Sequence, residues 1–117
     1  MVDVKFEYGK EIGYLSMTMR GHANFAELGK DVVCAGASIL GMTVAQAIQI
    51  MSDDGRLQKK ANITIRNGRI TVTAKPKPEH FAEALHSFYL GEVGMQLLAE
   101  AYPGTINFQG FVMSEED

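Results

Sequence analysis

Apolar and polar residues alternate at the start of the chain. From Val2 to Tyr8 every second residue is apolar or aromatic, and the residues between them are charged. A period of two residues predicts a strand with one face on a core and the other face in water. A two-residue turn at positions 9–10 would pair Val4 with Leu15, and the second strand would then end near Arg20.

The period changes to three and four residues between Val33 and Met51. This spacing is typical of an amphipathic helix whose apolar stripe faces a sheet. Aspartate is a favoured helix N-cap, so we expect the helix to begin directly after Asp31 and to end within the segment 52–55.

A second hairpin is predicted at Asn67-Gly68, because both residues tolerate the positive φ angles of a type I′ turn. The turn places six apolar residues on one face of the hairpin. Their predicted pairs are Ile65 with Ile70, Ile63 with Val72 and Ala61 with Ala74.

A second helix is predicted from near Glu79 to about Tyr102, and it carries two apolar stripes. The second stripe consists of Leu90, Val93 and Leu97. Either this stripe is buried between the sheet and the first helix, or it forms an interface between two copies of the chain. Pro103-Gly104 ends the helix, and the alternation over 106–112 predicts a last strand.

These elements predict a single α+β domain over residues 1–117 with the order ββαββαβ. We expect a mostly antiparallel five-stranded sheet with two helices on one face.

Composition and charge narrow the functional classes. The chain is 46% hydrophobic and 21% charged, and we find no run that looks long enough to cross a membrane. The first fifteen residues carry charges where a signal peptide needs an apolar core, so we expect a cytoplasmic protein. A net charge of −3 argues against direct nucleic-acid binding. Without a phosphate-binding glycine loop or paired Cys and His at metal-ligand spacing, we expect no cofactor and no metal.

The candidate chemistry centres on Cys34, the only cysteine, which falls in the first turn of the first predicted helix. The positive end of a helix dipole favours thiolate over thiol, and His22 is the nearest candidate base. The alternative is that Cys34 is a small buried hydrophobe and His22 makes a local hydrogen bond at a strand end. His80 and His86 lie far along the chain, and we expect both on the surface.

A motif surrounds this pair. Gly21-His22, Gly29, Asp31, Val33-Cys34-Ala35 and Ser38 resemble the signature of the ribosomal-processing cysteine protease family, called Prp. The resemblance extends to the chain length and the order of elements, while at Gly36 a larger small residue such as alanine is expected from the family.

The resemblance implies a bacterial cysteine protease that removes a short N-terminal extension from a large-subunit ribosomal protein. It further implies that this enzyme cuts after an aromatic residue and forms a homodimer. Carried over to this sequence, the catalytic pair is Cys34 and His22. Asp31 and Ser38 match further motif positions, and we assign both a supporting role.

On this interpretation His22 takes the proton of Cys34, the thiolate attacks a peptide carbonyl, and water releases the acyl-enzyme. Backbone N–H groups at the helix start stabilise the oxyanion. Asp31 either caps the helix or orients His22. Ser38 either bonds near the sulfur or bonds back to a helix carbonyl.

The residues that bind substrate are not fixed by these patterns, although Phe25 and Leu28 are candidates for an aromatic pocket. The alternative function is a non-catalytic module that binds a ribosomal protein or a nascent chain through the surface around Cys34. In that module Cys34 would be buried and replaceable, whereas a catalytic cysteine is reactive and irreplaceable. A thiol redox protein is disfavoured because no second cysteine is present to resolve a disulfide.

Overall fold

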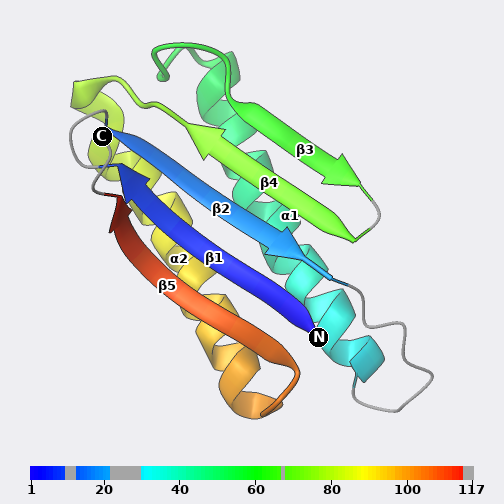
Figure 1. Ribbon diagram of the computed structural model, residues 1–117. Coiled ribbons are helices and arrows are strands. Elements are labelled where there is room, and N and C mark those ends of the chain that lie inside the picture. The colour runs from blue at the N-terminus through cyan, green and yellow to red at the C-terminus, as the bar shows by residue number, and fades with distance from the viewer. Residues whose placement is uncertain (10–12, 22–29, 67, 115–117) are drawn as a thin grey trace.

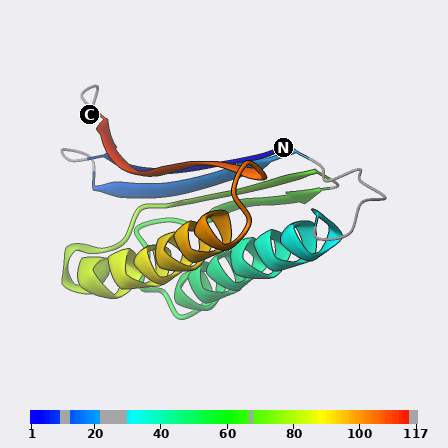
Figure 2. The same cartoon turned by 90° about the horizontal axis from the view of Figure 1, so that it is seen from below.

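The computed structural model describes residues 1–9, 13–21, 30–66 and 68–114. Two layers make up the molecule: one sheet, and two helices that both lie on the same face of it (Figures 1 and 2). The strands are β1 (Val2–Gly9), β2 (Tyr14–Arg20), β3 (Asn62–Arg66), β4 (Arg69–Ala74) and β5 (Ile106–Ser114). The helices are α1 (Lys30–Asp53) and α2 (Phe81–Ala101), and a short 3-10 turn, η1 (Pro78–His80), precedes α2. The predicted α+β class and the order ββαββαβ are confirmed.

The sheet has the strand order β3-β4-β2-β1-β5. Three of its neighbouring pairs are antiparallel, and β5 joins β1 in parallel, so the sheet is mixed (Figure 1). The parallel pair follows from α2, which carries the chain back along the covered face before β5 begins.

The second hairpin has the predicted register. Ile65 pairs with Ile70 and Ile63 with Val72. Only the outermost predicted pair, Ala61 with Ala74, is wrong, because β3 begins one residue later, at Asn62.

The first hairpin departs from its predicted register. Leu15 pairs with Tyr8 rather than with Val4. The strands are joined by a longer connection, in which Gly13 adopts the positive φ of 72° and donates a backbone hydrogen bond to the Gly9 carbonyl at 2.7 Å. The partner of Leu15 moves by an even number of residues, so each side chain keeps its predicted face.

The core lies between the sheet and the helices. Its largest fully buried side chains come from three strands, β1, β2 and β4, and from both helices. They are Phe6, Leu15, Met17, Val33, Ile48, Val72, Phe88 and Met95, with Val4 beside them.

The two apolar stripes of α2 have different environments. Phe88 and Met95 of the first stripe are fully buried. Leu90 and Leu97 of the second stripe are 57% and 61% exposed. The interpretation that the second stripe is buried between the sheet and α1 is therefore wrong, because α1 packs beside α2 and leaves that side of α2 open.

From Val32 to Asp53, α1 is long and apolar enough to cross a membrane by length and composition alone, contrary to the expectation drawn from the sequence. Within the fold, Val33, Val44 and Ile48 of this helix are buried against the sheet.

Candidate active site

Cys34 is the fifth residue of α1, and its side chain is half-buried. The helix begins at Lys30, so Asp31 lies inside the first turn and is not the residue that precedes the helix. The predicted N-cap is therefore wrong. Aspartate is favourable both at the cap and in the first turn, because either position faces unpaired backbone N–H groups, and residue type alone does not separate the two. Cys34 consequently lies one position beyond the first turn, where the field of the helix terminus is weaker than at the predicted place.

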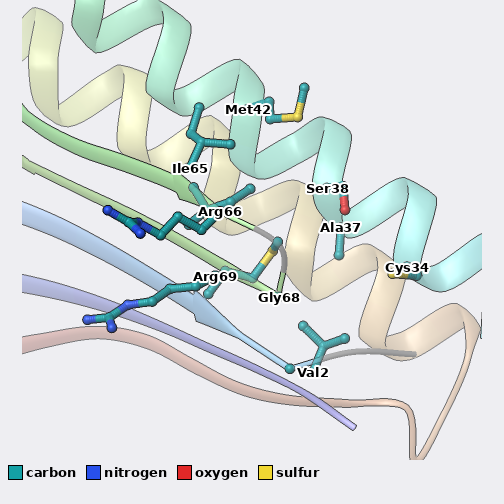
Figure 3. Close-up of a pocket in the computed structure, with 12 residues that line it drawn as sticks. Val2, Cys34, Ala37, Ser38, Met42, Ile65, Arg66, Gly68 and Arg69 are labelled. Carbon is teal, nitrogen blue, oxygen red and sulfur yellow. The ribbon is translucent and has the colours of Figure 1, made fainter. Parts of the chain in front are cut away.

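A cavity of about 170 Å³ lies beside Cys34, between α1 and the adjacent ends of the strands (Figure 3). The helix contributes Cys34, Ala37, Ser38 and Met42 to its wall. The sheet contributes Met19, Ile65, Arg66, Gly68, Arg69 and Ile70, and Val2 and Gly21 complete the rim. The charged ends of Arg66 and Arg69 extend away from Cys34 over the sheet, so the wall nearest the sulfur is mainly apolar (Figure 3).

Gly21 connects the end of β2 to this cavity. Its φ is 114°, its N–H donates a hydrogen bond of 3.0 Å to the Gly68 carbonyl, and a Cβ at this position would overlap the Met1 carbonyl oxygen. Only glycine fits such a conformation and such a close approach. The residue that directly precedes His22 is thus held on the rim of the cavity that Cys34 lines.

The structure brings two of the four predicted site residues together, Cys34 and Ser38, which line the same cavity one helical turn apart. Asp31 is placed by its backbone alone, in the first turn of α1. His22 lies outside the described residues, as do the pocket candidates Phe25 and Leu28. Among the described residues the Ser38 hydroxyl makes no hydrogen bond, and neither predicted role for it is tested.

Sequence reasoning missed the sheet side of the cavity. Met19, Ile65 and Ile70 come from three strands, and they meet α1 only because β4 pairs with β2. The predicted hairpin register already placed Ile65 and Ile70 on one face, which is the one signal that pointed to this wall.

The remaining histidines have other surroundings. His80 Nδ1 lies 2.7 Å from Glu83 Oε1, and Arg56 donates to Glu83 Oε2 at 2.7 Å. The hydrogen bond from His80, followed by the one from Arg56, holds the pKa of Glu83 below its usual value. His86 is exposed on α2. Within the described ranges, no three His, Cys, Asp or Glu side chains gather as they would around a metal ion.

The family model described as cysteine protease Prp matches residues 1–107. The ribosomal processing cysteine protease Prp of Bacillus subtilis (strain 168) is 36% identical over 52 residues, which cover 44% of this chain and 46% of that protein. The match therefore spans about half the length of that curated relative.

Solved structures share the whole fold. The ribosomal processing protease Prp of S. aureus, in complex with a substrate peptide, has a TM-score of 0.69 at 24% identity, over 96% of this chain and 100% of that chain. The same protease with a covalently linked product peptide has a TM-score of 0.68 at 25% identity and the same coverage. A protein from Streptococcus mutans has a TM-score of 0.68 at 23% identity, over 97% of this chain and 96% of that one. Because the family model covers nearly the entire chain, this protein belongs to the cysteine protease Prp family.

Proposed function

We propose that this chain is a cysteine endopeptidase that removes the short N-terminal extension of a bacterial large-subunit ribosomal protein by cutting after an aromatic residue. Family membership supports the reaction class, and the ribosomal processing role of the Bacillus subtilis relative supports the substrate class. The complex of the S. aureus protease with a substrate peptide supports a peptide as the ligand.

One observation carries the proposal: Cys34 opens onto an apolar cavity of the right size. A cavity of about 150 Å³ lined by apolar side chains binds benzene. The cavity beside Cys34 measures about 170 Å³ and therefore has room for one aromatic ring. Met19 and Met42 in its wall offer sulfur atoms, which make favourable contacts with aromatic rings.

In the proposed reaction Cys34 is the nucleophile and His22 is the base. His22 takes the thiol proton, and the Cys34 sulfur bonds to the carbonyl carbon that follows the aromatic side chain. The amine of the next residue then leaves with the proton that His22 returns to it. A water molecule hydrolyses the thioester and frees the sulfur. Backbone N–H groups at the start of α1 stabilise the oxyanion, and Asp31 and Ser38 are positioning residues around the pair.

The exposed apolar side chains of the helices support a homodimer. Leu97 and Tyr89 on α2 and Ile39 and Ile50 on α1 are about half exposed or more. Apolar side chains that gather on one surface mark interaction sites in soluble proteins. Replacement of Leu97 by glutamate would weaken such an interface, and sedimentation equilibrium of the two proteins would then report a lower mass for the variant. An equal mass for the two proteins would show that Leu97 is not part of the interface.

We place the enzyme in the cytoplasm, because its lone thiol must stay reduced to act as a nucleophile. Measurement of the protein in soluble and exported cell fractions tests this location.

The deciding experiment follows the cleavage itself. The purified protein, a Cys34→Ala variant and a His22→Ala variant are each incubated with the precursor ribosomal protein, and the product masses are measured. The unaltered protein should release the extension after an aromatic residue, and neither variant should do so. His86→Ala is the matched control, because His86 is exposed on α2 and away from the cavity, and it should cut normally.

Two other outcomes would contradict the proposal. If all versions bind the precursor and none cuts it, the protein is a binding module. If the Cys34→Ala variant cuts as well as the unaltered protein, Cys34 is not the nucleophile. Alkylation gives an independent check, because a catalytic thiol reacts readily near neutral pH whereas an inert buried thiol does not.

A further inference from the structure

Basic residues are concentrated in one part of the sequence. The segment 56–78 contains seven of the eleven lysines and arginines of the chain and no aspartate or glutamate. Strands β3 and β4 lie within this segment, and β2, which pairs with β4, has no acidic residue either. The net charge of −3 therefore conceals a part of the sheet whose charged side chains are all positive.

Three arginines, Arg20, Arg66 and Arg69, form a row at one end of these strands. Their neighbours Met19 and Ile70 are buried under the helices, so strand alternation turns the arginines to the side that the helices leave uncovered (Figure 2). Arg69 is directly opposite Arg66 on one side and Arg20 on the other. Like charges in such positions destabilise a sheet, so the row indicates a role other than folding.

No acidic side chain in the described part of the chain pairs with this row. Asp3 is opposite Arg20 in the register, but its Oδ1 accepts a hydrogen bond of 3.0 Å from Asn107 Nδ2. Glu7, the other acid of β1, has its Oε2 3.7 Å from Lys5 Nζ. Among the described residues, none of the ion pairs includes an arginine of the row, and all three arginines are exposed. The row can therefore bind an anion from solution.

A second basic cluster lies at the other end of the same face. It surrounds a hollow of about 330 Å³ lined by Tyr14, Lys59, Lys60, Asn62, Thr73 and Lys75. Each of these six side chains can donate a hydrogen bond, and none of them is acidic. The hollow thus presents the donors that an anion such as a phosphate group requires.

The surface between the two clusters is neutral and rich in hydroxyl groups. Alternation places on it the side chains of Ser16, Thr18, Thr64 and Thr71. Four residues of β3 separate the hollow from the arginine row, a distance of about 13 Å. Within these three strands Tyr14 is the only aromatic residue, so the face offers no row of rings on which unpaired bases could stack.

We propose that the uncovered face of β2, β3 and β4 binds double-helical RNA. The wide, shallow minor groove of an RNA duplex displays 2′-hydroxyls between two phosphate backbones. The arginine row and the lysines of the hollow would contact the phosphates, and the serine and threonines between them would contact the 2′-hydroxyls. Arg66 and Arg69 also line the cavity at Cys34, so a bound duplex would lie beside that cavity (Figure 3).

The Kd of a fluorescent RNA duplex of mixed sequence tests this face, and it is measured without cleavage, so the result does not depend on the proposed function. The double variant Arg20→Gln/Lys60→Gln removes one charge from each end of the face. The matched control is Lys5→Gln/Lys77→Gln, which changes the net charge equally at two other exposed positions. Arg20→Lys/Lys60→Arg keeps both charges and shows whether charge is what matters.

At about 0.1 M salt, Arg20→Gln/Lys60→Gln should raise the Kd by about tenfold to a hundredfold. The slope of log K against log salt should become shallower by about 2, one for each lost phosphate contact. The control and the charge-keeping variant should bind as the unaltered protein does. A DNA duplex of the same sequence should bind more weakly, because it lacks 2′-hydroxyls.

Four results would overturn the proposal. They are absence of binding to the RNA duplex, equal losses in Arg20→Gln/Lys60→Gln and the control, loss of binding in the charge-keeping variant, and equal affinity for RNA and DNA duplexes. Tighter binding of poly-glutamate than of RNA would also overturn it and would assign the face to an acidic protein instead.

Discussion

Replacement of Gly91 by alanine tests how α1 is held against α2. A Cβ on Gly91 would overlap Cγ2 of Val44 and would approach the Phe6 ring to 3.7 Å. Val44 is buried in α1, and a β-branched side chain in a helix has essentially one χ1 rotamer, so it cannot turn away. The helices would have to move apart.

Two opposing effects determine how much Gly91→Ala changes the free energy of unfolding. Alanine in a helix is favoured over glycine by about 1 kcal/mol. Overpacking of a well-packed core costs about 1–3 kcal/mol, and an overlap with backbone-anchored Val44 belongs at the upper end of that range. We expect Gly91→Ala to lower the free energy of unfolding by about 1–2 kcal/mol, the difference between these terms.

The matched control is Gly36→Ala in α1, where the new Cβ would meet only the terminal methyl groups of Leu98 at 3.3 Å. These methyl groups can shift, so the propensity gain should dominate and stabilise the protein by up to about 1 kcal/mol.

Urea denaturation of both variants measures these changes, and a double-mutant cycle with Val44→Ala identifies their cause. Without Cγ2 of Val44, the substitution Gly91→Ala should become neutral or stabilising. Equal destabilisation by Gly91→Ala in both backgrounds would refute the contact as the cause.

Three further changes have clear expected results. Gly21→Ala should lower both the unfolding midpoint and the cleavage rate, because the positive φ of Gly21 disfavours any side chain beside the cavity; unchanged values in both assays would contradict this. Phe88→Ala should cost about 3–5 kcal/mol in urea denaturation, because Phe88 is fully buried in the core, and a loss below 1 kcal/mol would be inconsistent with that position. The lowered pKa of Glu83, caused by His80 and Arg56, stabilises the fold above the usual value of 4.5, and this contribution disappears as pH falls through the folded-state pKa. Glu83→Gln should therefore flatten the fall in stability in that acidic range, and an unaltered pH profile would exclude the interaction.

Local patterns predicted most elements of this fold, because each depends on neighbouring residues. The alternation in β1 and the Asn67-Gly68 turn are of this kind, and the register of β3 with β4 followed directly from the turn. The turn between β1 and β2 was harder to predict. Gly9 and Gly13 both tolerate positive φ, and the sequence does not show at which of them the chain turns. Pairing of β2 with β4, which joins Met17 to Val72, holds β2 in the sheet independently of that turn.

The candidate site was predictable on its helical side only. Cys34 and Ser38 are four residues apart, which places them on one face of any helix. The opposite wall is formed by residues such as Met19 and Ile65, which are distant in the sequence and adjacent only in the sheet. The pairing of β1 with β5 is a long-range feature of the same kind, and periodicity alone carries no information about it.

The α1 wall and the β3 wall of the cavity at Cys34 differ in how firmly the fold holds them. α1 is fixed by its buried face and by its close contact with the glycines of α2, where Gly91 faces Val44 and Gly94 faces Leu40. β3 has a single neighbouring strand and contributes no fully buried side chain. Cys34 therefore lies on the wall that the core holds more firmly, so changes in β3 can alter the opposite wall of the cavity without rearranging the core that positions the sulfur.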